Sequence, residues 1–353
     1  MNLQQQARHV LQKNTTPQGI VAGSTHFNDV WARDALYASW GAINQELLQG
    51  PRNTLRTLKT YTSKHGQIPL RYGTTSMKRA FLHLPTKTGP VYGNDKTSDP
   101  AIDPNSLYLI TLEQYLDKHL DEELRDAKHI QQVADWLLEQ TNQDGLVDEG
   151  SYASWDDALK KNAPSIYNNA LAYAALKAAA RLTKTSRYKA AAKRIQQSSK
   201  QLYNGKYYDA WIDMPVLDVA GNLLAIHTGL ANKQETTHIL EALDKHKQAN
   251  NDQLPKTNYP RYPRKATYTP FYLVGMSDYH NSGPYWSWIA ALEALVREDK
   301  REEILTTLNN WTDLAGGIHE IYSKPGKPTK RLFYQSEKDF SWTAGLILAT
   351  INL

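Results

Sequence analysis

The sequence has 353 residues, of which 41% are hydrophobic and 10% aromatic, so it can bury a substantial core and general disorder is excluded. It contains no cysteine, which excludes disulfide frameworks, cysteine-ligated metals and thiol nucleophiles. The net charge of +5 is too small for this length to indicate nucleic-acid binding, and neither a secretory leader nor a run of about eighteen apolar residues is present. We therefore expect a soluble, cytoplasmic protein with no membrane partner.

Helical periodicity runs along the whole chain. Apolar residues recur at helical spacing over 31–49, 52–63, 104–119, 122–141, 165–182, 186–203, 217–231, 234–248, 284–297, 299–314 and 337–352. The polar segment 2–13 could supply one more helix. Short extended pieces are expected near 66–73, 145–148 and 316–322. Paired in order, the helices predict six helical hairpins.

Short and long connections alternate along the chain. Links such as 49–52 and 183–186 are short, whereas the segments 66–102, 142–164, 249–283 and 315–336 are long and rich in Trp, Tyr, Asp and Glu. Loops longer than about fifteen residues in a compact helical domain are usually functional. A closed ring of hairpins would place all of them on one face. We therefore predict an all-α fold, an (α/α)6 toroid that forms a single domain over residues 1–353; the lack of a strict repeat argues against a solenoid.

The aromatic residues are unevenly distributed among types, with 9 Trp and 21 Tyr but only 5 Phe. Trp and Tyr combine an apolar face with a polar group, which suits a partly wet partner such as a sugar ring, although many can lie at helix edges. A basic, tyrosine-rich stretch at 259–270 could stack nucleic-acid bases. Its three prolines favour an ordered surface loop or a sugar-facing wall instead.

The first candidate motif is WARDALYASWGA at 31–42. Arg33 and Asp34 stand directly before a helix of small and apolar residues. Asp34 can accept hydrogen bonds from sugar hydroxyls while Trp31 lies against the ring. The alternative is a helix-capping aspartate beside a salt bridge.

The second motif lies in the acidic segment 144–158, where Trp155 is followed directly by Asp156 and Asp157. A carboxyl group pressed against aromatic rings has its charged form disfavoured, so its pKa rises and it can act as a general acid. A solvated loop would explain the charges but not the tryptophan.

The third motif is GGIHEIY at 316–322, in which paired glycines can aim Glu320 into a cavity. The alternative is a turn with an exposed glutamate. If the chain closes into a ring, Glu320 can meet the aspartates of the second motif, and two carboxyl groups suffice for glycoside hydrolysis. No metal or cofactor is expected, since His26, His280 and His319 lack metal-ligand spacing.

In their order, the motifs resemble those of glycogen-debranching amylo-α-1,6-glucosidases and of glucoamylases. The matching segments are WARDA (31–35), IDPNSLYLITLEQYL (102–116), SWDDA (154–158), NALAYAAL (169–176), SGPYWSWI (282–289), GGIHEIY (316–322) and FSWTAGL (340–346). The order holds from residue 31 to residue 346, nearly the whole chain.

The resemblance implies a catalytic (α/α)6 domain that removes a terminal sugar with inversion, most closely an α-glucosidase acting on a carbohydrate substrate. It assigns Asp157 as the general acid and Glu320 as the general base; Asp156 stands where the family has Met, which leaves the acid open between the two aspartates. It also implies substrate-binding roles for Trp31, Arg33, Asp34, Asp103, Trp155, Asp156, Tyr167, Asn169, Trp286 and Trp342. The oligomeric state stays open.

Other functions stay open beside this one. Compact relatives act on glucosyl- or mannosyl-glycerate. A toroid that binds sugar without catalysis would have Asp157 and Glu320 pointing away from a common cavity. A sugar epimerase would need converging histidines, and a protein-interaction scaffold would carry its aromatic residues on helix faces.

Overall fold

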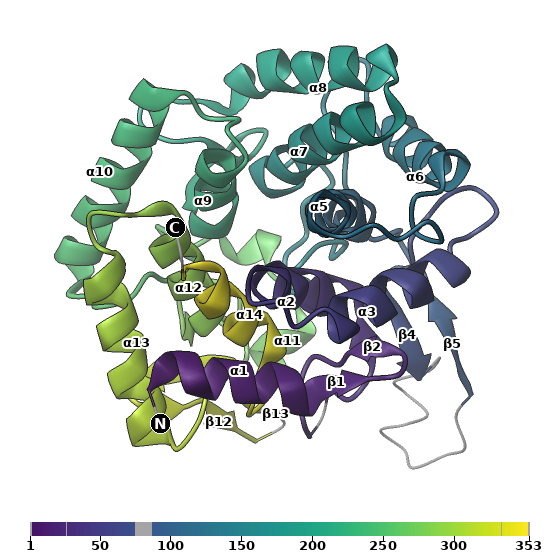
Figure 1. The fold of residues 1–353 in the computed structure, drawn as a ribbon. Helices are drawn as coiled ribbons and strands as arrows, with labels where there is room; N and C mark the ends of the chain where they lie inside the picture. Colours follow the sequence, from purple (N-terminus) through teal and green to yellow (C-terminus); the bar gives the residue numbers. More distant parts are fainter. Residues whose placement is uncertain (1, 26, 75–86, 333, 352–353) are drawn as a thin grey trace.

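The computed structural model describes residues 2–25, 27–74, 87–332 and 334–351, and within them the chain forms two concentric rings of helices (Figure 1). The inner ring consists of α2 (Ala32–Asn44), α5 (Asp103–Lys118), α7 (Ile166–Thr183), α9 (Val219–His227), α12 (Ser287–Val296) and α14 (Ser341–Ala349). The outer ring consists of α1 (Leu3–Asn14), α3 (Gln49–Thr60), α6 (Ala127–Glu139), α8 (Ser186–Ser198), α10 (Lys233–Asn250) and α13 (Arg301–Ala315).

Each inner helix packs against the next one, and α14 packs back onto α2, which closes the ring. Each inner helix also packs against at least one outer helix; α1 takes this place beside α14, so the first and last helices of the chain lie side by side (Figure 1). The predicted all-α toroid of helical hairpins is confirmed.

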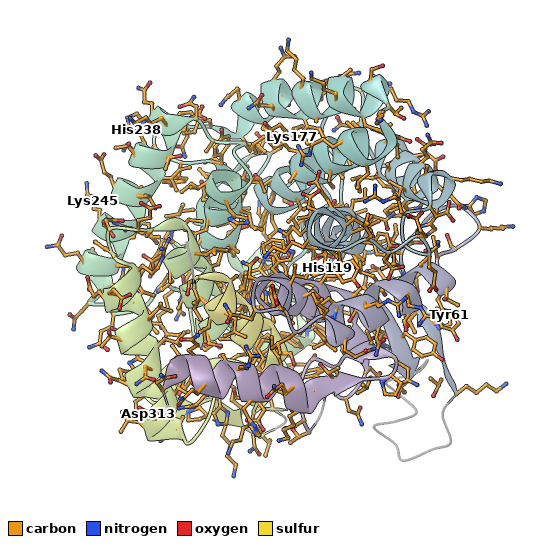
Figure 2. The ribbon with its side chains drawn as sticks, in the orientation of Figure 1. Tyr61, His119, Lys177, His238, Lys245 and Asp313 are labelled. Atoms are coloured by element: carbon orange, nitrogen blue, oxygen red, sulfur yellow. The ribbon has the colours of Figure 1, made fainter. Side chains whose placement is uncertain are left out.

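The two rings differ in which faces are apolar. In α2 every residue from Ala32 to Ile43 is buried, and in α14 all positions are buried. The outer helix α8 buries only Tyr188, Ala192 and Ile195 along one stripe. A helix that is apolar all round belongs in an interior, and one with a single stripe belongs at a surface. Lys245 and His238 of α10 accordingly lie at the outer circumference (Figure 2).

The ring closes where two glycines allow α2 and α14 to approach. A Cβ added to Gly41 would lie 1.9 Å from the carbonyl oxygen of Gly345. A Cβ added to Gly345 would lie 2.3 Å from the Cα atom of Ala38. Since both clashes are with backbone atoms, the two helices could not approach this closely with larger residues.

Helix boundaries shift where local chemistry overrides periodicity. The helix predicted over 122–141 begins only at Ala127, because the Asp126 side chain caps it by accepting a hydrogen bond from the His129 amide at 3.1 Å. The helix predicted over 31–49 ends at Asn44, since residues 45–48 form the link to α3.

The long segments contain small antiparallel sheets. Three have three strands: β3 (Val30–Trp31), β4 (Arg71–Thr74) and β5 (Thr88–Val91); β6 (Asp209–Trp211), β7 (Met214–Asp218) and β8 (Asn258–Tyr259); and β9 (Tyr285–Trp286), β10 (Ile321–Lys324) and β11 (Lys327–Pro328). Two are hairpins: β1 (Thr15–Thr16) with β2 (Gly19–Ile20), and β12 (Lys330–Arg331) with β13 (Tyr334–Gln335). The extended pieces predicted near 66–73 and 316–322 overlap β4 and β10, whereas 145–148 holds only an isolated bridge at Val147.

The long segments all run from an outer helix to the next inner helix, and the short links run from inner to outer. The long segments therefore share one face, at the amino-terminal ends of the inner helices, as predicted. α11 (Pro270–Leu273) is a short helix within one of these segments. No helix in the described residues combines the length and the apolar character needed to cross a membrane.

Candidate active site

The predicted motifs meet on the face that carries the long segments. Arg33 and Asp34 lie in the first turn of α2, and Asp103 is the first residue of α5. Asp157 lies in the segment before α7, and Glu320 directly precedes β10. The amino-terminal ends of helices carry partial positive charge, which favours carboxylates at this face.

Arg33 and Asp103 form a buried ion pair beneath the site. The Arg33 guanidinium donates to Asp103 through Nε, and through Nη2 at 3.2 Å. Burial alone would lower the pKa of Arg33, but the Asp103 carboxylate outweighs burial and the pKa is raised. Tyr167 donates to Asp103 at 3.4 Å, and its hydroxyl lies 3.3 Å from that of Tyr37. Asp103 and Tyr167 therefore hold Arg33 in place.

Asp34 is buried beside this pair. Burial raises the pKa of its carboxyl group to about 7, although Arg33 acts in the opposite direction. A carboxyl group with this pKa can both donate and accept hydrogen bonds near neutral pH, which suits contact with sugar hydroxyls.

Asp157 lies at the mouth of the site with its side chain 50% exposed. Lys96 Nζ lies 3.0 Å from Asp157 Oδ2. Burial alone would raise the pKa of Asp157, but the Lys96 ammonium outweighs burial and the pKa is lowered. This corrects the expectation that Trp155 would raise it: a nearby cation decides the balance, and the sequence motif does not contain that cation.

His280 adjoins Asp157 but carries no charge near neutral pH. Its Nδ1 atom lies 3.8 Å from Asp157 Oδ1 and accepts a hydrogen bond from the Ala158 amide at 3.2 Å. Burial lowers the pKa of His280 to about 4. Lys96 is therefore the cation that keeps Asp157 ionised.

Lys96 is held in a cage of aromatic rings. Its ammonium lies 5.9 Å from the ring centre of Tyr152, 5.5 Å from that of Tyr268 and 5.8 Å from that of Phe271. Such contacts stabilise a cation by about 0.5–2 kcal/mol each, depending on exposure. The cage places a positive charge at the outer side of Asp157.

Glu320, unlike Asp157, is buried. Tyr334 donates to Glu320 Oε2 at 2.5 Å, and the Glu320 amide donates to the Glu337 carbonyl at 2.9 Å. Burial raises the pKa of Glu320 to about 8, with a further contribution from the charge of Asp34 and against the opposing effect of the Tyr334 hydrogen bond.

The Tyr279 ring lies between those of His280, which adjoins Asp157, and Tyr334, which donates to Glu320. Burial raises its pKa well above the ordinary value, and the charges of Glu320 and Asp157 both add to this shift. The Tyr279 ring lies 5.1 Å from that of Tyr334 and 4.5 Å from that of His280. Carboxyl groups that are 163 residues apart in the sequence are thus joined by a chain of contacts through His280, Tyr279 and Tyr334.

Aromatic side chains surround this centre. Trp155 contacts Trp286 edge-to-face at 5.5 Å between ring centres, and Trp286 stacks on His280 at 4.7 Å. Trp31 is half-buried and has the Arg71 guanidinium over its ring at 4.7 Å. Trp342 instead lies deeper, stacked on Tyr37 at 4.8 Å and on another tryptophan at 4.0 Å. We therefore assign Trp342 to the packing beneath the site.

Two other predicted substrate contacts are occupied by protein partners. Asp156 is buried with its carboxylate 2.6 Å from Lys161 Nζ. Asn169 donates to the carbonyls of Val147 and Ser165 and accepts from the Val147 amide. Of the two aspartates, Asp157 is therefore the accessible one, since its side chain is 50% exposed and that of Asp156 is 2% exposed.

The described histidines that an epimerase would need pack against different rings. His280 lies against Trp155, whereas His319 lies against Tyr322, and His26 is outside the described residues. The described residues also include no group of three or more His, Asp or Glu side chains that could hold a metal ion.

The tyrosine-rich stretch at 259–270 contacts the motif that contains Trp155. The Tyr262 ring is buried and stacked on Trp211 at 4.9 Å. The Tyr268 amide donates to the Ala158 carbonyl at 2.8 Å. Because Tyr262 is already stacked within the protein, its ring is not available to a nucleic-acid base.

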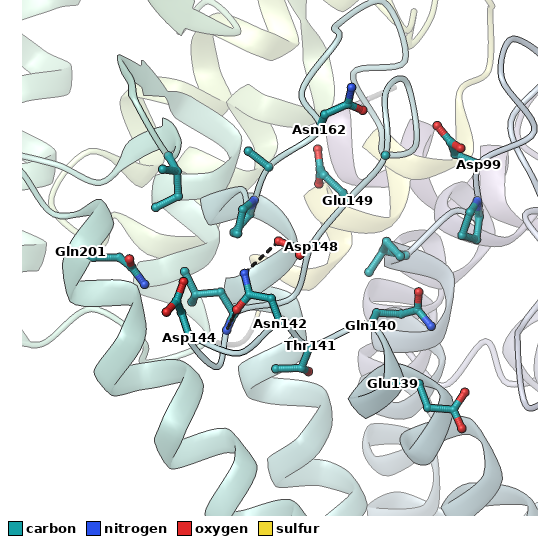
Figure 3. Close-up of a pocket in the computed structure, with 17 residues that line it drawn as sticks. Asp99, Glu139, Gln140, Thr141, Asn142, Asp144, Asp148, Glu149, Asn162 and Gln201 are labelled. Atoms are coloured by element: carbon teal, nitrogen blue, oxygen red, sulfur yellow. Dashed lines mark hydrogen bonds between the residues drawn. The ribbon is translucent and has the colours of Figure 1, made fainter.

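A separate cavity of about 690 Å³ is lined by residues of three segments, those before α5, before α7 and before α9 (Figure 3). Its carboxylates include Asp99, Asp148 and Glu149, and the Asn142 amide donates to Asp148 at 3.0 Å. The described residues that line it do not include Asp157, so it is distinct from the candidate active site.

Sequence reasoning missed several residues of the site: Lys96, Lys161, Tyr279 and Tyr334. None belongs to a recognisable motif, and Lys161 follows the second motif as one of two lysines that look solvated. The position of Tyr279 beside His280 was the one available signal.

Comparison with models of protein families and with curated proteins finds no match. Solved structures do match. The GH63 mannosylglycerate hydrolase of Thermus thermophilus, in complex with Tris and D-glycerate, has a TM-score of 0.70 at 14% identity over 98% of this chain and 99% of its own. A bacterial glucoamylase in complex with acarbose has a TM-score of 0.68 at 14% identity over 98% and 54%.

A rhamnosidase from Klebsiella oxytoca with rhamnose bound is also similar, with a TM-score of 0.67 at 14% identity over 98% of this chain and 62% of its own. At this identity the likeness shows the fold: the chain has the (α/α)6 architecture of these glycoside hydrolases.

Proposed function

We propose that the chain is an inverting, exo-acting glycoside hydrolase, with residues 1–353 acting as a single catalytic domain. The chain of contacts that links Asp157 to Glu320 through His280, Tyr279 and Tyr334 carries this proposal. Asp157 gives its proton to the glycosidic oxygen as the bond to the anomeric carbon breaks. Glu320 takes a proton from the water that attacks that carbon from the opposite face. For this geometry we expect the carboxyl groups to lie roughly 6.5–9.5 Å apart.

The mechanism needs one proton on the two carboxyl groups together, and the free site holds one, but on Glu320 and not on Asp157. Near pH 7 Glu320 is mostly protonated, since burial raises its pKa to about 8, and Asp157 is ionised, since its pKa lies below the ordinary value. The proposed roles need that proton on Asp157. Substrate binding favours the transfer, because a sugar ring that displaces water from Asp157 raises its pKa.

We propose an α-glucoside as the substrate, as in amylo-α-1,6-glucosidases. Asp34 and Arg33 are buried in the first turn of α2, where they could hold a terminal sugar, and the half-buried Trp31 directly precedes this helix.

Paired substitutions test the two roles. Asp157→Asn should lower hydrolysis of a sugar–sugar bond by roughly 10²–10⁴-fold but largely spare a dinitrophenyl α-glucoside, whose leaving group needs no proton. Glu320→Gln should impair both substrates by orders of magnitude, since neither can react without an activated water. Asp135→Asn, which affects an ion pair with Arg187 on the outer ring, is the matched control. Near-normal activity in Glu320→Gln would remove the proposed base.

A glycoside of a small carboxylic acid is a second candidate substrate, favoured by Lys96. A carboxylate on the leaving group would pair with the caged ammonium and release Asp157 to take up a proton. The similar enzyme of Thermus thermophilus is named for a glycoside of glycerate. Lys96→Met should then weaken hydrolysis of glucosylglycerate at least tenfold while hydrolysis of a neutral glucoside is retained. Equal effects on both substrates would argue for the neutral glucoside.

A further inference from the structure

Behind the proposed acid lies a buried charge cluster centred on Lys161. Its ammonium lies 2.6 Å from Asp156 Oδ1, 3.0 Å from Glu149 Oε1 and 2.9 Å from the Ser154 hydroxyl. The side chains of Lys161 and Asp156 are each 2% exposed, and that of Glu149 is fully buried. Transferring these charges out of water is unfavourable, and apolar residues of similar size would often be more stable here.

The cluster is completed by neutral donors and by a third carboxyl group. Glu149 Oε2 accepts from the Ser165 hydroxyl at 2.7 Å, and Asp156 Oδ1 accepts from the Ser154 hydroxyl at 2.7 Å. Asp218, which directly precedes α9, lies within the field of the cluster: burial raises its pKa to about 7 and the Asp156 charge adds to the shift. The charges of the cluster thus act on a carboxyl group at the start of the next hairpin.

Asp156 and Asp157 are neighbours in the chain whose side chains face opposite ways. Asp156 points into the cluster, and Asp157 points to Lys96 at the mouth of the site. The backbone between them and Lys161 is a turn, in which the Leu159 amide donates to the Asp156 carbonyl at 2.9 Å. Fixing the Asp156 side chain therefore fixes the direction of the Asp157 side chain.

We propose that Lys161 is a positioning residue that, through Asp156, aims the Asp157 carboxyl group at the glycosidic oxygen. This inference rests on the proposed function. Lys161 takes no part in the reaction itself; its effect is confined to proton transfer to the leaving group. A displacement of about 1 Å in a reacting group can lower a rate about 100-fold.

The double variant Lys161→Met/Glu149→Gln tests the inference, because it removes one charge of each sign and keeps the side chains close to their original size. We expect kcat for a sugar–sugar bond to fall about 100-fold with little change in KM. With the dinitrophenyl α-glucoside, kcat should fall less than threefold. The matched control is Lys247→Met/Glu293→Gln, a buried pair with both oxygens 3.0 Å from the ammonium, between α10 and α12. This control variant should change kcat for both substrates by the same factor.

A second pair of variants covers the case in which the double variant fails to fold, as judged by circular dichroism. Asp156→Asn keeps an oxygen that accepts from Ser154 and Lys161 and should retain most activity, whereas Asp156→Ala should show the same selective loss. Equal losses on both substrates in the folded variants would overturn the role of Lys161. A wild-type protein that cleaves neither glycoside would instead overturn the proposed function, so the two failures are distinguishable.

Discussion

At the scale of single residues, Tyr334 controls the proton on the proposed base. Its hydroxyl donates to Glu320 at 2.5 Å, and this hydrogen bond opposes the rise in the pKa of Glu320 that burial causes. In the free state Glu320 is protonated and Asp157 is ionised. The active form, in which Asp157 carries the proton and Glu320 is ionised, is therefore the less populated one. The pH profile of kcat/KM then falls on its alkaline side at the pKa of Glu320, about 8.

Tyr334→Phe removes this hydrogen bond, so the pKa of Glu320 should rise by about one unit, the equivalent of a charge-assisted hydrogen bond of about 1.4 kcal/mol. The alkaline limb of kcat/KM should move upward, and the plateau should fall about tenfold because the active form becomes rarer. Tyr208→Phe, which loses a hydrogen bond of 2.9 Å to Glu235 on the outer ring, should leave the profile unchanged. An unshifted alkaline limb in Tyr334→Phe would contradict this role.

At the scale of secondary-structure elements, the contact between α2 and α14 decides whether the ring closes and brings Glu320 to Asp157. The contact depends on Gly41 and Gly345, where an added methyl group meets backbone that cannot move aside. Overpacking of this kind outweighs the better helix propensity of alanine, which is about 1 kcal/mol.

Gly345→Ala should therefore lower the free energy of unfolding by about 3 kcal/mol or more, measured by urea denaturation. Gly50→Ala on the outer helix α3 is the comparison, since its added methyl group would meet the side chains of Ile20 and Thr15 at 2.8 Å. Side chains can rotate away, so the loss there should be smaller. A stability equal to wild type in Gly345→Ala would mean that the helices can separate without cost.

At the scale of the whole molecule, buried carboxyl groups make stability depend on pH. Burial raises the pKa of Asp34 and of Asp218 to about 7 and that of Glu320 to about 8. Between their unfolded pKa values near 4 and these folded values, the folded state holds more protons than the unfolded state. Stability is therefore lost as pH rises through the folded pKa values.

The histidines affect stability in a different pH range. Burial lowers the pKa of His129 and of His280 to about 4, so the stability that they contribute is lost as pH falls from about 6.5 towards 4. Between pH 6.5 and 8 the carboxyl groups act alone, and the urea midpoint should decline steadily. Asp218→Asn should flatten this decline. A midpoint that rises with pH over this window would show that the carboxyl groups are ionised throughout.

The ring of hairpins could be predicted from the sequence because each helix carries its own apolar pattern and the alternation of short and long links implies a closed order. The positions of Asp157 and Glu320 followed from motifs with a tryptophan or paired glycines beside them. Lys96 could not be found this way, because its contact with Asp157 spans 61 residues and exists only after the ring closes. The lowered pKa of Asp157 was missed for the same reason.

The sequence also could not predict that the Asp156 side chain points into the interior. Two adjacent aspartates after Trp155 look equivalent, and only the burial of Lys161 behind them decides which faces the site. Trp342 and Asn169 likewise sit in apolar or small-residue helices whose depth in the ring no local pattern reveals.

The most direct test of the proposed mechanism is the configuration of the first sugar released. The wild-type protein would be incubated with an α-glucoside, and the anomeric proton of free glucose would be followed by NMR before mutarotation. Attack of water from the face opposite the leaving group predicts that β-glucose appears first. α-Glucose as the first product would contradict an inverting reaction between Asp157 and Glu320.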